Sequence, residues 1–550
     1  MNAKESVLQQ LLDGKSQYRV PLFQRTYNWS ETEWDRLWND VLETYMMEEP
    51  RNHFIGAVVT QPVDDAAGQV TKYLLIDGQQ RLTTLFIMLS CIRKKASQAA
   101  ELSSLAEEIW EDCLVNKFAP ASEDFIKLRP TQRDRPHFSA VINGEDTDED
   151  GQVLAAFRYF LKRIDDGDLE GIPLDLRKLK SCISDRLDLV SITLSTGDSP
   201  HRIFESLNNT GMYLGASDLI RNLIFMNISR EKEAQDAYDK HWFPMQEATG
   251  NNLDDFFWNY LMMNGSLPRW DEIFEEVKER FGDGGTQKAV EMLIDFSKFA
   301  RYYRWICEIG DEEPQRSLLQ GIRRLNAWEV SVAYPFLMRS LDWVDEARIS
   351  FSDLVTVIKM IESFVVRRAV CYVPTNQLRG IFARMWGHVD FSDFVTSSRN
   401  YLLGNRWPSD DEFKDAFVGF HLYNPRRLGR TRLILESLED SFGHREAPNV
   451  TEDITIEHVM PQTLTTEWKD MLGPKVEEVY SQWLHTPGNL TLTGYNSELG
   501  NASFYKKKES LECSKFSLTH SVLKYEQWDE DVIKARGEEL AERAIQIWSR

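Results

Sequence analysis

The sequence predicts an α+β protein built from several domains, and three observations support this. The chain has 550 residues, more than one hydrophobic core usually organises. Strand-like and helix-like patterns alternate up to about residue 225, whereas 226–410 has almost only helical periodicity. In the last part, helical segments surround two short strand-like segments. The predicted domains are therefore 1–225, 226–410 (a helical connector) and 411–550.

The composition limits the classes of protein to which the chain can belong. Hydrophobic residues make up 42% of the sequence and aromatic residues 11%, which favours folded domains over disorder. The formal net charge of −23 disfavours non-specific coating of nucleic acid, so any such contact must be local. The 6 cysteines are scattered without a CxxC pair, which disfavours structural zinc and fits a reducing compartment. No signal peptide or membrane-spanning run is recognisable, so we expect a cytoplasmic protein without a membrane partner.

Two units of the N-terminal part can be read from local signals. A capping-box pattern begins at Ser30 and precedes apolar residues at helical spacing, which predicts an amphipathic helix. Residues 72–76 read as a strand, Asp77-Gly78 as a tight turn and 80–93 as an apolar helix. A strand, a glycine turn and a helix start direct backbone N–H groups toward an anion.

A glycine-bounded acidic loop at 144–151, in the N-terminal part, lacks the spacing of an EF-hand and is predicted to lie on the surface.

Helical periodicity dominates the middle of the chain. A polar linker is predicted at 444–453, before the last domain. Further helices are predicted at 253–263, 289–309, 351–371, 428–438 and 528–548.

The most informative motif lies near the C-terminus. Residues 456–462 read Ile-Glu-His-Val-Met-Pro-Gln, and 488–496 read Gly-Asn-Leu-Thr-Leu-Thr-Gly-Tyr-Asn. This predicts a strand ending in an acid and a His, a second strand opened by Asn, and a helix carrying another Asn. Such a ββα-metal hairpin is the active site of HNH nucleases. There, Glu457 and Asn496 hold one divalent cation, Mg²⁺ or Mn²⁺, while His458 takes a proton from water.

Two basic clusters flank this motif. Each of them, taken alone, also fits a solvated surface run. Their position on either side of the His-Asn pattern favours a role in binding DNA. The first cluster contains Arg426, Arg427, Arg430 and Arg432, and the second contains Lys506, Lys507 and Lys508.

Four N-terminal segments concentrate polar side chains near predicted helix ends. Each alone has an ordinary structural explanation, because Asp-Gly forms turns, Asn-Gly ends helices and Ser-Asp caps them. No GxxxxGK[ST] pattern occurs, so phosphate binding cannot be inferred from a P-loop. The four segments are 20–29, 77–84, 203–211 and 217–222.

In order and content, these segments resemble the N-terminal domain of GmrSD-like, modification-dependent (type IV) restriction enzymes over roughly residues 5–225. The resemblance implies a ParB-like or sulfiredoxin-like core that binds and hydrolyses a nucleoside triphosphate. A guanidinium binds phosphate bidentately and a helix start supplies N–H donors, so the motif fits this role. The implied site contains Asp77, Gly78, Gln79, Gln80 and Arg81, lined by Gln24 and Arg25.

Residues of about 411–550 resemble the HNH domain of the same family. Its pattern of Glu-His-x-x-Pro-Gln, Gly-Asn-Leu-x-Leu, Asn and a final Lys is complete. The resemblance implies that His458 is the general base and that Glu457 and Asn496 bind the metal. It further implies that Asn489 braces the loop of the hairpin.

Several residues keep alternative readings. Either Lys506 or Lys508 is implied to contact the scissile strand. His485 either assists the site or is an ordinary surface or hydrogen-bonding His, and the second reading is favoured. Arg367 and Arg368 also match a segment of the family, and salt-bridged helix residues are their favoured reading.

The motifs predict a nuclease, and the resemblance implies that it is a bacterial anti-phage restriction enzyme. Nucleoside triphosphate binding and hydrolysis in the N-terminal domain would control cleavage or nicking of modified DNA by the HNH domain. One alternative is a non-cleaving, nucleotide-driven switch or DNA-binding protein, although Glu457, His458 and Asn496 are all retained. Another is an RNA-targeting, toxin-like nuclease that causes abortive infection. The recognised modification, the preferred nucleotide and the oligomeric state, a homo-oligomer included, stay open.

Overall fold

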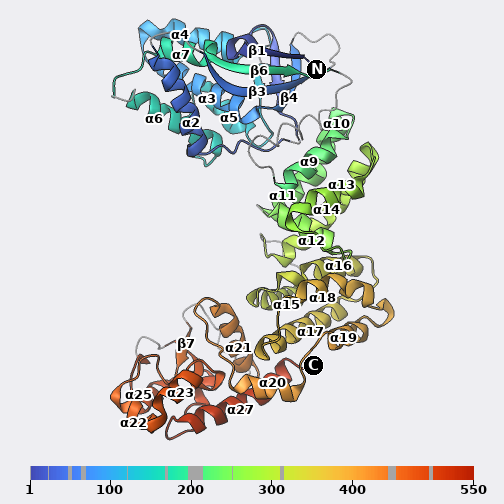
Figure 1. Ribbon diagram of the computed structural model, residues 1–550, viewed down its shortest axis with the longest axis vertical. Helices are drawn as coiled ribbons and strands as arrows, with labels where there is room; N and C mark the ends of the chain where they lie inside the picture. The colour runs from blue at the N-terminus through green and yellow to red at the C-terminus, as the bar shows by residue number, and fades with distance from the viewer. Residues whose placement is uncertain are drawn as a thin grey trace. The chain divides into compact units, whose positions relative to one another are not determined.

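The computed structural model is a mostly helical α+β protein (Figure 1). It packs as two units, residues 1–243 with 274–294, and residues 244–273 with 295–550. The predicted division into three domains stays a prediction. The structure describes residues 2–22, 24–47, 52–63, 70–119, 122–167, 171–195, 215–250, 252–309, 315–443, 454–494 and 499–550.

A mixed six-stranded sheet organises the first unit, in the order β1-β6-β3-β4-β2-β5. Strand β4 pairs antiparallel with β3 and parallel with β2, so it lies inside the sheet. Its C-terminal end at Asp77 pairs with Val59 of β3, whereas the pairing with β2 ends at Leu74. The strands are β1 (Asn2–Val7), β2 (Ser16–Arg19), β3 (His53–Pro62), β4 (Thr71–Asp77), β5 (Leu128–Arg129) and β6 (Leu187–Thr193).

Helix α3 is the central helix of this unit and is buried along nearly its whole length. It packs against α4, α5, α6 and α7, which explains why every position from Leu82 to Ile92 is buried. In Figure 1, α2, α3, α5 and α6 lie together beside the labelled strands. The helices are α1 (Leu8–Leu12), α2 (Glu31–Met46), α3 (Gln79–Ala96), α4 (Ser103–Glu108), α5 (Arg135–Asn143), α6 (Gln152–Asp166) and α7 (Leu176–Asp185).

The local N-terminal predictions are confirmed. The backbone N–H of Ser30 donates to Glu33 Oε2 at 2.8 Å, which completes the capping box of α2. Strand β4, the turn at Gly78 and helix α3 follow where the sequence places them. The short-range signals of the capping box, the apolar run and the glycine turn were sufficient to predict these elements.

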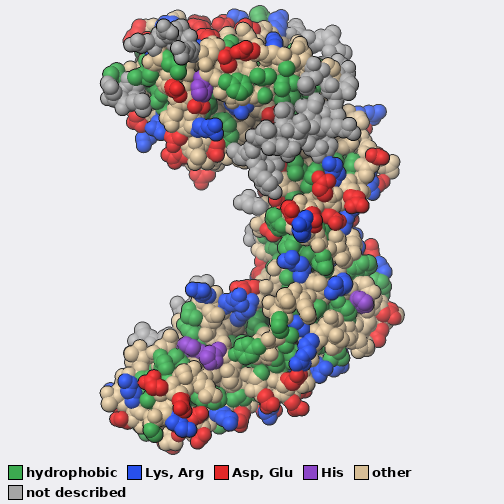
Figure 2. Space-filling model, in the orientation of Figure 1, with side chains coloured by type: hydrophobic (Ala, Val, Ile, Leu, Met, Phe, Trp, Pro, Cys, Tyr) green, Lys and Arg blue, Asp and Glu red, His purple; other side chains and the backbone are tan. Residues whose placement is uncertain are grey.

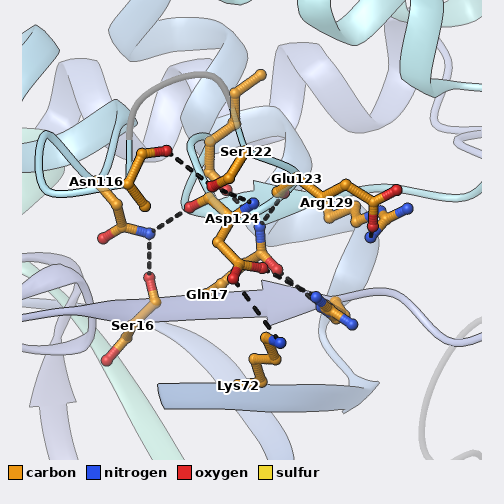
Figure 3. A network of polar contacts seen from close by, with 11 residues as sticks. Ser16, Gln17, Lys72, Asn116, Ser122, Glu123, Asp124 and Arg129 are labelled. Carbon is orange, nitrogen blue, oxygen red and sulfur yellow. Dashed lines mark hydrogen bonds and ion pairs between the residues drawn. The ribbon is translucent and has the colours of Figure 1, made fainter. Parts of the chain in front are cut away.

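A polar network fixes the β2 edge of the sheet (Figure 3). The buried Gln17 side chain donates to the carbonyl oxygens of Glu123, at 2.7 Å, and Ile126, at 3.0 Å. Asp124 pairs with the Arg19 guanidinium at 3.0 Å. The Gln17 bonds tie the loop before β5 to the start of β2, where β5 itself does not pair.

Between 215 and 443 the described residues contain helices and no strand, as the periodicity predicts. The predicted helices at 253–263, 289–309, 351–371 and 428–438 are confirmed as α12, α14, α17 and α21. The helices are α9 (Ala216–Met226), α10 (Glu231–Ala237), α11 (Phe243–Thr249), α12 (Leu253–Met262), α13 (Ile273–Phe281), α14 (Thr286–Ile306), α15 (Arg316–Ala327), α16 (Tyr334–Asp345), α17 (Phe351–Val370), α18 (Leu378–Met385), α19 (Phe394–Gly404), α20 (Asp410–Val418) and α21 (Leu428–Asp440). The predicted linker at 444–453 lies outside the described residues.

Arg367 of α17 joins distant parts of the second unit. Its guanidinium donates to the carbonyl oxygens of Trp548, at 2.6 Å, and Pro408, at 3.1 Å, and pairs with Asp410 at 2.6 Å. The neighbouring Arg368 is also buried and donates to backbone carbonyls. Both side chains therefore hold α17 against the segments around it, and Arg367 is salt-bridged.

The last part of the second unit carries a two-stranded antiparallel hairpin of β7 and β8, in which Glu457 faces Thr491 and His458 faces Leu490. A two-stranded ribbon is marginal on its own and needs packing partners. The elements are β7 (Thr455–His458), α22 (Thr466–Leu472), α23 (Val476–Trp483), β8 (Leu490–Thr493), α25 (Phe504–Leu511), α26 (Ser517–His520) and α27 (Glu530–Ile547), with a 3₁₀ turn, η9 (Pro487–Asn489), before β8.

Helix α27 clamps the start of β8. The fully buried Arg536 donates to the carbonyl oxygens of Pro487 (3.1 Å), Gly488 (2.7 Å) and Leu490 (2.9 Å). A Cβ on Gly488 would lie 2.1 Å from the carbonyl oxygen of Ile533, so only glycine permits this approach. Burial lowers the pKa of Arg536 to about 10, which still leaves it charged at neutral pH.

Two absences follow for the described residues. No helix among them has the length and apolar character that crossing a bilayer requires. The six cysteines are all free thiols.

Replacing Arg536 by Met should destabilise the second unit by about 3–5 kcal/mol, because several buried carbonyl groups lose their donor. Urea unfolding followed by tryptophan fluorescence measures this. Lys534→Met, at an exposed position of the same helix, is the matched control and should leave the transition unchanged. Equal midpoints for the two variants would contradict the clamp.

Candidate functional site

The end of β7 presents the acid and the imidazole of the C-terminal motif. Glu457 and His458 are buried, with exposed fractions of 4% and 5%. The ammonium of Lys507, from α25, forms an ion pair with the Glu457 carboxylate and donates to the carbonyl oxygen of His458 at 2.8 Å. Burial raises the pKa of Glu457 and lowers that of Lys507, while their mutual attraction opposes both shifts. A charged pair is therefore enclosed directly under the hairpin.

Both ring nitrogens of His458 have neighbours. Its Nε2 lies 3.1 Å from His485 Nδ1, and its Nδ1 lies 3.4 Å from Gln462 Nε2. The Tyr423 ring meets the imidazole edge-on, with 4.5 Å between ring centroids. Burial, with contributions from His485 and Lys507, lowers the pKa of His458 to about 3. At neutral pH the imidazole is neutral and can accept a proton.

The Asn489 side chain is fully buried and uses its whole hydrogen-bonding capacity inside the protein. Its Oδ1 accepts from the N–H of Met460 at 2.7 Å and from Trp528 Nε1 at 3.0 Å. Its Nδ2 donates to the carbonyl oxygens of Met460 at 3.0 Å and Leu484 at 2.9 Å. Asn489 thus joins β7, α23 and the segment before α27.

Of the three consecutive lysines, the structure brings Lys507 to the site. Lys506 is exposed, and Lys508 donates to the carbonyl oxygen of Tyr525 at 2.8 Å. The sequence predicts all three as a basic cluster and Lys506 or Lys508 as the contact to the scissile strand. The sequence could have identified Lys507 by its helical spacing from two apolar residues. Phe504, Lys507 and Leu511 share the buried face of α25.

Two further residues lie at the site: His485, for which the sequence favours an ordinary surface or hydrogen-bonding His, and Tyr423, which the sequence does not single out. The ring of His485 stacks on Tyr423, with centroids 5.4 Å apart and an interplanar angle of 17°. Tyr423 precedes the motif by more than thirty residues, so no local pattern could identify it. Figure 2 shows histidine side chains gathered on one face of this unit, with Lys and Arg side chains near them.

The predicted N-terminal site begins at a turn that requires glycine. Gly78 has a φ of 88°, and a Cβ there would lie 2.9 Å from the carbonyl oxygen of Ala57. Arg81 donates to that same oxygen at 2.8 Å. Its guanidinium also covers Gly56, where a Cβ would lie 2.7 Å from Nη2. The turn after Asp77 and the first turn of α3 are thereby held against β3.

The two glutamines of this motif bind the backbone of a neighbouring loop. Gln79 Nε2 donates to the carbonyl oxygen of Arg25 at 3.1 Å, and Gln80 Nε2 donates to that of Thr26 at 3.0 Å. The N–H of Asn28 donates back to Gln80 Oε1 at 2.9 Å. The amides therefore fix the loop that carries Arg25 next to the start of α3.

Charged side chains converge around that loop. Burial lowers the pKa of Arg25, whose neighbours include Asp218, Arg221 and Asp77. Burial also raises the pKa of Asp77, against the influence of Gly78 N–H, Arg81 and Arg25. Arg221 is itself buried and pairs with Asp218 at 2.5 Å. Gln24, the other predicted lining residue, is buried and donates to the carbonyl oxygen of Ile76 at 2.8 Å.

Two family models match the chain. One describes the N-terminal domain of the GmrSD restriction endonuclease and matches residues 8–225. The other describes the C-terminal domain of GmrSD restriction endonucleases and matches residues 407–543. The chain belongs to the GmrSD restriction endonuclease family. A search of curated proteins finds no match.

In this GmrSD-family chain, the predicted DNA-contacting arginines differ in their surroundings. Arg430 pairs with Glu329 at 2.8 Å, and Arg432 pairs with Glu436 at 2.6 Å. The other two lie in the exposed loop after Tyr423, although Arg427 also approaches Glu329 at 3.7 Å. Arg426 and Arg427 are thus the exposed members of the cluster.

The implied metal site is only partly within the described residues. Asn496 lies outside them, as does the predicted segment 203–211 of the N-terminal domain. In the described part of the chain, no three His, Cys, Asp or Glu side chains gather as a metal site would need. Glu457 offers a hard oxygen donor, but it is paired with Lys507. The described residues therefore supply one donor and not a complete ligand set.

Replacing Lys507 by Met should lower the thermal midpoint of the second unit, because Glu457 would be buried without its partner, at a cost of about 3–5 kcal/mol. Lys506→Met is the matched control and should leave the midpoint unchanged. Adding Glu457→Gln to Lys507→Met should recover part of the loss, since the buried charge is removed. A double variant less stable than either single one would refute the pairing.

Proposed function

We propose that this chain is a metal-dependent HNH endonuclease of the type IV restriction class, whose N-terminal domain binds and hydrolyses a nucleoside triphosphate to control cleavage. The observation that most directly supports this proposal is the neutral, buried His458 beside Glu457 at the end of β7. It is supported by membership of the GmrSD family. The proposal includes a ββα-metal hairpin at β7–β8 and a ParB-like core around β4 and α3.

The chemistry of the C-terminal site follows from its protonation. A neutral His458 can take a proton from a water molecule as that water attacks the phosphorus of a phosphodiester. Arg426 and Arg427, in the loop that also carries Tyr423, would hold the flanking phosphates of DNA. A divalent cation held by Glu457 and Asn496, Mg²⁺ or Mn²⁺, would stabilise the charge that develops on the phosphate and the leaving oxygen.

The chemistry of the N-terminal site follows from its guanidinium groups. Arg25, Arg81 and Arg221 converge near the start of α3, with Asp77 and Asp218 as counter-charges. Guanidinium groups and a helix N-terminus together favour a phosphate ligand. We assign this place to the triphosphate, with Asp77 orienting a water or a cation.

One observation favours a second candidate, a non-cleaving switch or DNA-binding protein. The Lys507 ammonium occupies the neighbourhood of Glu457, where a cleaving site would hold its cation. Cleavage assays with several metals separate the two candidates. The assays use DNA with and without base or backbone modifications. RNA as a further substrate tests the toxin-like alternative.

His458→Ala should lower cleavage of modified phage DNA in Mg²⁺ or Mn²⁺ on the order of 10²–10⁴-fold, the contribution of a general base. Rates from a gel-based time course measure the loss. His520→Ala, at an exposed histidine of the same unit, should cleave as the unmodified protein does. Unchanged cleavage by His458→Ala would disprove the nuclease assignment.

Arg25→Met should weaken nucleoside triphosphate binding at least about tenfold, because a charge-assisted contact to phosphate is worth on the order of 1.5–3 kcal/mol. Titration calorimetry with each of the common triphosphates measures it. Arg36→Met, at an exposed arginine of α2, is the control. If the unmodified protein bound none of them, the nucleotide half of the proposal would be wrong and the nuclease half would stand.

A further inference from the structure

Two imidazoles face each other at the C-terminal site. His458 Nε2 and His485 Nδ1 lie 3.1 Å apart, a hydrogen-bonding distance. Two ring nitrogens that both carry lone pairs would repel at this distance, so one of them must carry the proton. Which nitrogen carries it decides which nitrogen of His458 can act as a base.

The Gln462 amide, on the other side of the His458 ring, indicates which ring nitrogen of His458 carries the proton. Gln462 Nε2, an amide donor, lies 3.4 Å from His458 Nδ1. A proton on Nδ1 would place donor against donor, whereas a lone pair on Nδ1 accepts from the amide. The arrangement therefore favours His458 with its proton on Nε2, donated to His485 Nδ1. The lone pair on Nδ1 of His458 then faces the Gln462 amide at 3.4 Å, and a substrate water that replaces this long contact would meet the same lone pair.

His485 is held rigidly enough to act as a fixed acceptor. Its carbonyl oxygen accepts from the backbone N–H groups of Leu422, at 2.8 Å, and Tyr423, at 3.2 Å. Its ring stacks nearly parallel on that of Tyr423. The preceding residue, Leu484, is held in turn by the Asn489 amide at 2.9 Å. The imidazole thus has both its backbone and its ring plane fixed.

We propose that His485 is a positioning residue, whose Nδ1 accepts the Nε2 proton of His458 and so keeps Nδ1 of His458 as the base. The inference rests on the proposed nuclease function. In the reaction, an O–H bond of water breaks and its proton goes to His458 Nδ1. The hydroxyl oxygen bonds to phosphorus, and the bond from phosphorus to the leaving oxygen breaks, with that oxygen protonated from solvent. The resulting imidazolium then makes a charge-assisted hydrogen bond to His485.

Two substitutions separate this role from simple packing. In His485→Asn, the amide Oδ1 is attached to Cγ as Nδ1 is in His, so the acceptor is kept and the stacked ring is lost. In His485→Phe, the ring that stacks on Tyr423 is kept and the acceptor is lost. We expect His485→Asn to keep kcat within about threefold and His485→Phe to lower it on the order of 10²–10⁴-fold, with KM nearly unchanged. Loss of activity in the Asn variant with retention in the Phe variant would overturn the proposal.

A second measurement does not depend on cleavage. In full-length protein labelled with ¹⁵N-histidine, the nitrogen chemical shifts of His458 report its tautomer. We expect a protonated Nε2 and an unprotonated Nδ1 in the unmodified protein and in His485→Asn, and loss of this preference in His485→Phe. A proton on Nδ1 in the unmodified protein would overturn the positioning role. If the tautomer is as expected but no variant cleaves any nucleic acid, the nuclease proposal fails and the hydrogen bond stands.

Discussion

The C-terminal site depends on the hydrogen bonds of one buried amide, that of Asn489. A hairpin of two short strands has too few backbone bonds to hold its own geometry. The Asn489 side chain supplies the additional hydrogen bonds. It joins Met460 after β7, Leu484 after α23 and Trp528 before α27. Burying these polar groups without partners would cost on the order of 1–3 kcal/mol for each one. The amide therefore fixes where β7 ends, and with it the directions of Glu457 and His458.

Buried side-chain amides also fix the backbone around the N-terminal site. Gln79 and Gln80 direct their amides to the backbone of 25–28, and Gly78 and Gly56 admit close approaches that a Cβ would prevent. Several motif residues in both units thus hold the backbone rather than face a ligand. The ligand contacts proposed above would fall to charged groups on the adjoining loops, among them Arg25 in the first unit and Arg426 in the second.

The sequence predicted what depends on neighbours along the chain. Strand β4, the turn at Gly78 and helix α3 are specified by a short apolar run, a glycine and helical periodicity over some twenty residues. The order of the sheet and the partners of His458 depend instead on packing between distant segments. Tyr423 and His485 meet because the loop after α20 bonds to the turn after α23, and no local pattern encodes that contact. For Lys507 the sequence predicts the burial but not the partner. Its helical spacing from Phe504 and Leu511 indicates that it lies on the buried face of α25.

The protonation of His458 links its chemistry to the arrival of substrate. With a pKa of about 3, the imidazole is neutral but a weak base, since general-base catalysis is most efficient when the pKa lies near the working pH. The shift is caused first by burial and then by the neighbouring His485 and Lys507. A phosphodiester brought against the site carries a negative charge, which opposes these influences and raises the pKa of His458. In the nuclease function proposed above, the base would therefore gain strength when a phosphate is in place, and a net charge of −23 would make that event depend on local arginines rather than on long-range attraction.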